Sequence, residues 1–161
     1  MKFILYNNSF RNILLIPALL ISLGVMGQNS FENTEEKSIV TTVKNADLKW
    51  GECPPFMPDG CGIAVLHGDP AKQNVDILFK VQGNSYIPNH WHNSPERMIL
   101  LEGELQVTYE NETSQIMKVG SYAYGPSKKP HTAKCLSKDP CVIFIAFEQP
   151  LDAFAIETDK K

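Results

Sequence analysis

Turn-forming residues break this 161-residue chain into short pieces, and this constrains the fold more than any other feature. Eleven prolines and ten glycines lie among short apolar runs, and no stretch keeps a helical period beyond a few residues. Residues Leu105–Tyr109 instead alternate apolar and polar side chains, as a strand with one buried face does. The sequence therefore predicts an all-β fold.

Ten short strands are predicted between these breaks, because β-type segments recur with turn signals on either side. They are Ala46–Trp50, Gly62–His67, Val75–Val81, Tyr86–His92, Arg97–Glu102, Glu104–Glu110, Thr113–Lys118, Ser121–Tyr124, His131–Leu136 and Val142–Glu148. So many short strands in a chain of this length favour a two-sheet sandwich or a small barrel.

Residues 1–27 are predicted to be a secretory signal peptide rather than part of the fold. Lys2 and Arg11 precede an apolar run over residues 13–26, which is shorter than the roughly 20 residues that a spanning helix needs. Cleavage after Gly27 would leave a periplasmic or secreted protein with no membrane contact. An uncleaved membrane anchor is the alternative.

The rest of the chain is predicted to form a leader and one domain. Residues 28–40 are polar and acidic, which is typical of a flexible leader. Residues 41–158 hold all the predicted strands and are expected to form a single domain. The net charge of −3 offers no broad basic surface, so nucleic-acid binding is not expected.

The four cysteines agree with export, since disulfides persist in oxidising compartments. Cys53 and Cys61 enclose one turn-rich loop, and Cys135 and Cys141 enclose another. We favour the two local pairings, each of which would stabilise the fold by roughly 2–3 kcal/mol. Four cysteines allow three connectivities, however, and the sequence does not choose between them. Free structural thiols and a thiolate metal site are alternatives, although neither pair has the C-x2-C spacing of a zinc ribbon.

Three of the four histidines are spaced so that they could bind one metal ion together. His90 and His92 lie two apart on a predicted strand and so share a face. Glu96 follows after a proline bend, and His131 begins a later predicted strand. If these strands meet, three imidazoles and a carboxylate would suit one divalent transition metal ion, namely Fe, Mn, Ni, Cu or Zn. A His-X-His pair also occurs by chance in β proteins, and we interpret His67 as structural.

Two segments resemble the two sequence motifs of the cupin superfamily. The first motif matches Gly83, His90, His92, Glu96 and Gly103, and the second matches Gly120, Pro126 and His131. Three departures are present: the gap before His90 is one residue longer than usual, Lys128 replaces a usual glycine, and Cys135 replaces a usual asparagine. The chain is more loosely similar to the cupin part of the ChrR anti-sigma factor.

The resemblance implies a jelly-roll (double-stranded β-helix) cupin barrel with the metal inside, bound by His90, His92, Glu96 and His131. It implies a metal-dependent enzyme acting on a small organic substrate, with dioxygenase chemistry favoured over non-redox isomerase or lyase chemistry. Glu96 could then also move a proton, as a catalytic residue. The alternatives are a non-catalytic periplasmic ligand-binding or sensor cupin, and a metal that only holds the barrel together. Pairing of exposed edge strands would give a homodimer.

Strand parity extends these expectations to the walls of the barrel. Met98 and Leu100 should share the inward face of Glu96, whereas Arg97 should point away. Parity also predicts that Tyr86 faces the interior, and Phe144 is expected to line the opposite wall. Arg97 is the only arginine after the signal peptide, so a small neutral or weakly acidic ligand is favoured.

Overall fold

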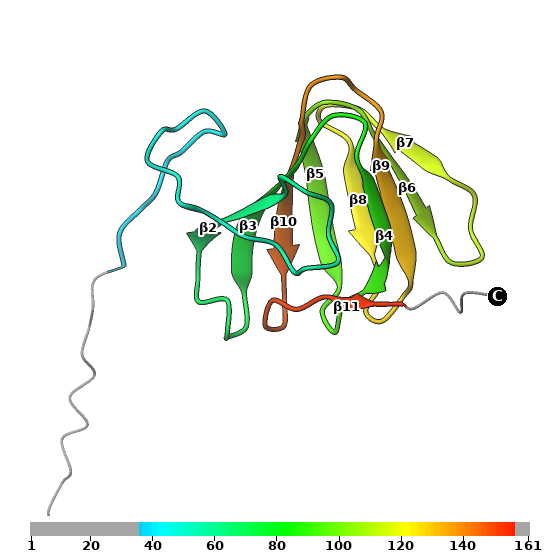
Figure 1. Cartoon of the computed structure of the whole chain (residues 1–161). Coiled ribbons are helices and arrows are strands. Elements are labelled where there is room, and N and C mark those ends of the chain that lie inside the picture. Colours follow the sequence, from blue (N-terminus) through cyan, green and yellow to red (C-terminus); the bar gives the residue numbers. More distant parts are fainter. Residues whose placement is uncertain (1–35, 157–161) are drawn as a thin grey trace, which may run out of the picture. The chain divides into compact units, whose positions relative to one another are not determined.

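The computed structural model describes residues 36–156 (Figure 1). The predicted signal peptide over residues 1–27, most of the predicted leader and residues 157–158 lie outside this described part. The chain divides into two compact units, and the second, Ile39–Lys161, contains every strand of the described part. Within residues 36–156, no helix is long and apolar enough to cross a membrane.

The described part is built from strands and contains no helix, which confirms the all-β prediction. Its eleven strands are β1 (Trp50–Gly51), β2 (Gly62–His67), β3 (Val75–Val81), β4 (Tyr86–Trp91), β5 (Glu96–Glu102), β6 (Leu105–Tyr109), β7 (Gln115–Met117), β8 (Tyr122–Gly125), β9 (His131–Cys135), β10 (Cys141–Phe147) and β11 (Phe154–Ala155).

These strands form two antiparallel sheets that enclose the core. The six-stranded sheet has the order β1-β2-β3-β10-β5-β8, and the five-stranded sheet has the order β11-β4-β9-β6-β7. Strands far apart in sequence are neighbours, since β10 pairs with both β3 and β5, and β9 pairs with both β4 and β6. This crossing connectivity is what brings the predicted ligands of β4 and β9 onto adjacent strands.

Alternate residues of the central strands fill the space between the sheets. Ile77, Leu100 and Ile143 are almost fully buried there, and burial of each such side chain contributes roughly 1.5–3 kcal/mol. The prediction that Phe144 lines the barrel wall is wrong. Its side chain packs on the outer face, against a cluster formed by Ala64, Leu78 and Val142.

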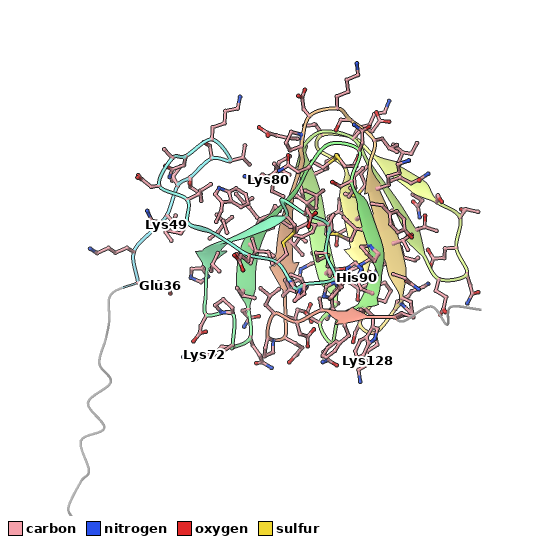
Figure 2. All side chains as sticks on the ribbon, in the orientation of Figure 1. Glu36, Lys49, Lys72, Lys80, His90 and Lys128 are labelled. Atoms are coloured by element: carbon pink, nitrogen blue, oxygen red, sulfur yellow. A yellow bond between two sulfur atoms is a disulfide. The ribbon has the colours of Figure 1, made fainter. Side chains whose placement is uncertain are left out.

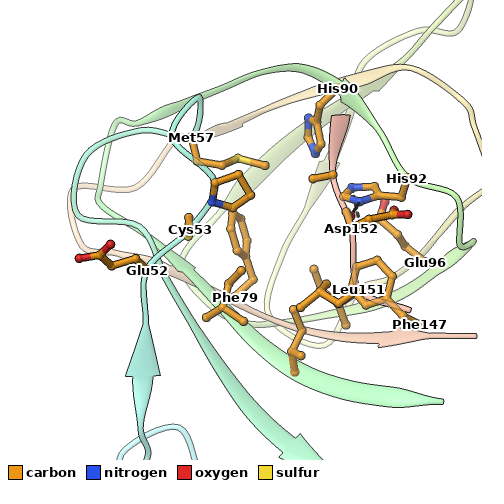
Figure 3. A pocket seen from close by; sticks show the side chains of 15 residues that line it. Glu52, Cys53, Met57, Phe79, His90, His92, Glu96, Phe147, Leu151 and Asp152 are labelled. Carbon is orange, nitrogen blue, oxygen red and sulfur yellow. Dashed lines mark hydrogen bonds and ion pairs between the residues drawn. The ribbon is translucent and has the colours of Figure 1, made fainter. Parts of the chain in front are cut away.

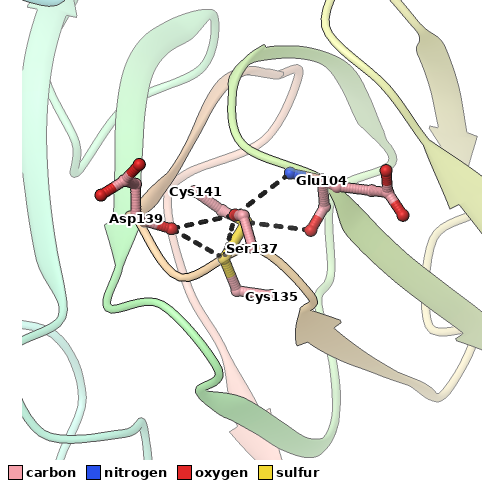
Figure 4. The surroundings of a disulfide bond; sticks show 5 residues. All are labelled: Glu104, Cys135, Ser137, Asp139 and Cys141. Carbon is pink, nitrogen blue, oxygen red and sulfur yellow. Dashed lines mark hydrogen bonds between the residues drawn. A yellow bond between two sulfur atoms is a disulfide. The ribbon is translucent and has the colours of Figure 1, made fainter.

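Both favoured disulfides are present, Cys53–Cys61 and Cys135–Cys141. The first closes the loop between β1 and β2. The second closes the β9–β10 connection, where the Ser137 hydroxyl donates to the Asp139 carbonyl at 2.9 Å (Figure 4). The cysteines therefore hold two loops and leave no free thiol in the described part of the chain.

Two elements differ most from the sequence prediction, beyond shifts of one or two residues at the ends of other strands. The strand expected over Ala46–Trp50 is reduced to β1, and β11 was not expected. Strand β11 exists because it pairs with β4, through Phe154 opposite Trp91 and Ala155 opposite His90. Figure 1 shows it running across the lower ends of the barrel strands, so it carries the C-terminal segment past the predicted site.

Candidate metal centre and adjoining cavity

Strand register places the predicted ligands in two rows that face each other across the barrel. In one sheet, His131 on β9 lies opposite His90 on β4 and Tyr109 on β6. In the other sheet, Glu96 on β5 lies opposite Gly125 on β8 and Phe147 on β10. His92 follows β4 directly and joins the same level of the barrel.

The structure brings all four predicted residues together. The candidate ligand atoms of His90, His92 and His131 lie within 4.8 Å of one another, so these three histidines could hold a metal ion. The Glu96 carboxylate approaches two of them, with 3.4 Å from Oε1 to Nε2 of His92 and 3.4 Å from Oε2 to Nε2 of His131. All four side chains are between 4 and 7% exposed, and Figure 2 shows His90 among the strands rather than at the surface.

Backbone carbonyls fix how the three imidazole rings are turned. The Nδ1 atom of His90 lies 2.7 Å from the Pro88 carbonyl, and that of His131 lies 3.0 Å from the Lys129 carbonyl. The Nδ1 atom of His92 bonds to the Asp152 carbonyl. Since a carbonyl only accepts, each Nδ1 donates a proton, and each Nε2 is left with its lone pair.

The donor set fits a transition metal ion. The Nε2 atom of His92 is buried and has no hydrogen-bond partner in the described part of the chain. Such an atom is costly unless something satisfies it, and a cation between the three rings and Glu96 would do so. Three imidazole nitrogens with one carboxylate oxygen suit several divalent transition metals.

Burial keeps the three imidazoles uncharged at neutral pH. Together with the neighbouring His131 and His92, it lowers the pKa of His90 to about 3. Burial also lowers the pKa of His92 and of His131, although Asp152 opposes it at the first and Glu96 at the second. Burial raises the pKa of Glu96, against the effect of His131. Neutral imidazoles are the form that binds a metal.

A β-bulge in β4 aims His90 at the site. The pairing of β4 with β9 shifts register between Ile87 and His90, so both of these residues face inward. Tyr86 consequently faces outward and is 55% exposed, and the prediction that it faces the interior is wrong. A bulge holds one extra residue, which accounts for the longer gap before His90, and its Pro88 carbonyl is the one that orients the His90 ring.

The turn before His131 keeps a glycine-like conformation without a glycine. Lys128 has a φ of 59°, in the left-handed region that glycine adopts most easily. Its amide donates to the His92 carbonyl at 2.7 Å, while its side chain points to solvent (Figure 2). The departure from the cupin motif at this position therefore changes the residue type and preserves the turn.

Tyr109 is a site residue that the sequence analysis missed. Its ring lies 5.2 Å from that of His131, and its buried hydroxyl has no hydrogen-bond partner in the described part of the chain. A Cβ atom added to Gly125 would lie 2.8 Å from this hydroxyl and 3.0 Å from Oε2 of Glu96, so the two groups reach the same place. Burial, together with Glu96, raises the pKa of Tyr109 and keeps the hydroxyl protonated. The available signal was its parity with Leu105 and Val107 on an alternating strand.

A cavity of about 340 Å³ opens beside the histidines (Figure 3). Apart from the predicted ligands and two further acids, Glu52 and Asp152, its lining is apolar or sulfur-bearing. These lining residues are Cys53, Pro54, Met57, Ile63, Ile77, Phe79, Ile145, Phe147, Leu151 and Ala153. The lining comes from the inner sheet face, from the Cys53–Cys61 loop and from the segment before β11.

The sequence profile of the family described as "ChrR Cupin-like domain" matches residues 38–150. The chain belongs to the ChrR-like cupin family. This confirms the predicted membership of the cupin superfamily. No curated protein matches this cupin in sequence.

Solved structures share its fold at low identity. The DMSP lyase DddQ from Ruegeria pomeroyi DSS-3 has a TM-score of 0.60 and 17% identity, over 71% of this chain and 64% of that one. The polyketide cyclase RemF from Streptomyces resistomycificus has a TM-score of 0.61 and 18% identity, over 76% of this chain and 89% of the RemF chain. Oxalate decarboxylase from Lactobacillus farciminis has a TM-score of 0.56 and 17% identity, over 68% of this chain and 34% of the decarboxylase chain. These likenesses confirm the jelly-roll, double-stranded β-helix fold. The chain spans less than two thirds of the DddQ and oxalate decarboxylase chains.

Proposed function

We propose that this cupin binds one divalent transition metal ion through the Nε2 atoms of His90, His92 and His131 and a carboxylate oxygen of Glu96. The observation that carries the proposal is the buried Nε2 of His92, which has no hydrogen-bond partner in the described part of the chain although the Glu96 carboxylate lies 3.4 Å away. The Nδ1 atoms of all three histidines are bonded to carbonyls instead. Fe, Mn, Ni, Cu and Zn are all compatible with this donor set.

We propose further that the protein is a metal-dependent enzyme acting on a small organic substrate. The cavity supports this proposal because it adjoins three of the four ligands and is large enough for a small molecule. When bound, the metal would act as a Lewis acid or as a redox centre. Dioxygenase chemistry is our favoured class. A non-redox lyase or isomerase reaction is the other, and the lyase and cyclase among the structural neighbours support it.

Two side chains at the proposed metal centre of this cupin can hold or donate protons. Burial raises the pKa of Glu96, so its carboxyl holds a proton more readily than an exposed glutamate when it is not ligating. The Tyr109 hydroxyl keeps its proton and can donate a hydrogen bond near Oε2 of Glu96. We therefore assign Glu96 the catalytic role and Tyr109 a supporting one.

Metal analysis followed by an activity screen tests this function. Protein purified without a histidine tag should contain about one transition metal ion per chain, and metal removal should lower its melting temperature. Metal-loaded protein should then convert members of a panel of catechols, diketones, flavonols and uronates, with oxygen uptake separating the two reaction classes. Absence of metal, and of any stabilisation by added metal, would overturn the proposal. Ligand binding without turnover would indicate the non-catalytic sensor instead.

We propose that the protein is exported to the periplasm or secreted. The two disulfides support this location, since such bonds persist in oxidising compartments. Amino-terminal sequencing of the mature protein should begin at Gln28. An intact Met1 on protein isolated from cells would contradict the proposal.

We also propose a homodimer formed through an edge strand. Strand β8 is an edge of the six-stranded sheet, and its Tyr122 and Tyr124 are exposed. Sedimentation analysis should show a dimer that Tyr122→Lys weakens. A monomer at high concentration would contradict it.

A further inference from the structure

We propose that the cavity accepts a largely apolar organic molecule, uncharged apart from one oxygen-bearing group that reaches the metal centre, and disfavours small dianions such as oxalate. This inference rests on the proposed function for the metal and names the substrate class of the same site.

The first support is the shape and chemistry of the walls. Phe79 and Phe147 line the cavity from the inner face of one sheet, and Met57 and Leu151 line it from the two segments that cover this face (Figure 3). The three predicted ligands His90, His92 and Glu96 lie along one side. A ligand that fills this space must place a polar group against the histidines and bury apolar surface elsewhere.

The second support is the sign of the charges. Glu52, Glu96 and Asp152 are acidic residues among those that line the cavity, and none of the described residues that line it is a lysine or an arginine. The guanidinium of Arg97 is turned away and is paired with Glu148. A dianion in this cavity would find no protein cation and an excess of negative charge in the lining, to which the exposed Glu52 contributes. The fold shared with oxalate decarboxylase therefore does not extend to its substrate.

The third support is that the two covering segments are held in place, which favours a defined ligand shape. The loop that carries Met57 is closed by the Cys53–Cys61 disulfide. The segment that carries Leu151 is fixed at Asp152, whose carboxylate accepts from the backbone N and from Nδ2 of Asn93 at 2.9 and 2.7 Å. The Leu151 amide also donates to the Pro70 carbonyl at 2.9 Å.

Two hydroxamates and oxalate test this class on zinc-loaded protein by calorimetry. Acetohydroxamate and benzohydroxamate carry the same chelating group, and only the second carries a ring for the apolar walls. Benzohydroxamate should bind at least about tenfold more tightly, because the ring leaves water, and oxalate should bind more weakly than either. Equal affinity for the two hydroxamates, or tightest binding of oxalate, would overturn the proposal.

Charge reversal at Glu52, an exposed residue of the cavity lining, provides a matched comparison. Glu52→Lys should raise oxalate affinity by about three- to tenfold and leave benzohydroxamate affinity unchanged. Asp139→Lys makes the same charge change on an exposed residue of the β9–β10 loop, at the end of β9 opposite to His131, and should change neither. An equal effect of both variants on oxalate would contradict a local role of Glu52.

A metal-free measurement separates this inference from the proposed metal site. Benzamide, which is neutral, should shift the NMR signal of the Met57 methyl group in metal-free protein and leave that of Met117 unchanged. Met117 is an internal control, since it does not line this cavity. An unshifted Met57 signal would overturn the proposed ligand class of the cavity even if the protein binds zinc. Failure of the protein to bind zinc would overturn only the proposed metal site.

Discussion

Asp152 connects the segment that covers the cavity to the orientation of one proposed ligand, and Asp152→Ala should therefore weaken metal binding from outside the donor set. The Asp152 carboxylate accepts two hydrogen bonds from Asn93, while its own carbonyl accepts from Nδ1 of His92. Removal of the carboxylate releases the segment from Asn93. The carbonyl then holds the His92 ring less firmly, because the segment is positioned by the hydrogen bond of the Leu151 amide and by the pairing of β11 with β4.

The expected loss of zinc affinity follows from these contacts. Two hydrogen bonds to a half-buried carboxylate contribute about 1 kcal/mol each, so the attachment of the segment should weaken by roughly 2 kcal/mol. Loss of the group that orients a metal-binding histidine typically costs about 10- to 100-fold in metal affinity. Asp152→Ala keeps the orienting carbonyl and loosens the segment that carries it, so we expect zinc affinity to fall by about tenfold, at the lower end of that range.

Chelator competition measures zinc affinity, and the cobalt absorption spectrum reports the geometry of the site independently of stability. Asp69→Ala is the matched control, because the Asp69 carboxylate also accepts from a loop amide, that of Ala71 at 3.0 Å, but does not line the cavity. Asp152→Asn keeps one acceptor oxygen and should recover part of the affinity. Unchanged zinc affinity in Asp152→Ala, or an equal loss in Asp69→Ala, would refute this account of His92.

Three further predictions concern the same barrel. Between pH 7.5 and 5.5, His90 alone should cost the metal-free protein about 1.4 kcal/mol of stability in urea unfolding, because unfolded His90 gains a proton near its ordinary pKa of about 6.5 whereas folded His90, with a pKa of about 3, does not. His92 and His131, whose pKa values burial also lowers, should add to this loss. Glu96 has the opposite effect on stability, because its raised pKa favours the folded state as the pH falls. Glu96→Gln should therefore steepen the loss of stability between pH 7.5 and 5.5. Stability that does not change over this pH range would contradict the lowering of the histidine pKa values by burial. Tyr109→Phe should leave the melting temperature of metal-free protein unchanged or higher, since the hydroxyl it removes has no partner in the described part; a clear decrease would show that the hydroxyl is satisfied. Replacement of Cys53 and Cys61 by serine should cost roughly 2–3 kcal/mol and weaken benzohydroxamate binding, whereas the same change at Cys135 and Cys141 should cost a similar amount and spare binding; equal effects on binding would argue against the loop as a cavity wall.

The sequence predicted what depends on local spacing. The alternation in β6 and the two-residue spacing of His90 and His92 are local, and so are the turns that hold each cysteine pair. The face shared by Glu96, Met98 and Leu100 follows from parity alone and is confirmed by their burial.

The errors arose where parity changes or where a contact comes from a distant segment. Tyr86 was assigned to the wrong face because the bulge before His90 reverses the alternation. Phe144 was misplaced because β10 is apolar on both faces, so its sequence does not show which face is inside. The bond of Asp152 to His92 depends on β11, a two-residue strand that forms only by pairing with β4.

The most direct test of the metal centre is a crystal structure of zinc-loaded protein with anomalous diffraction measured at the zinc edge. We predict a single strong peak per chain, about 2.1 Å from Nε2 of His90, His92 and His131 and from a carboxylate oxygen of Glu96. A peak at any other place, or none at this one in crystals that hold zinc, would contradict the account.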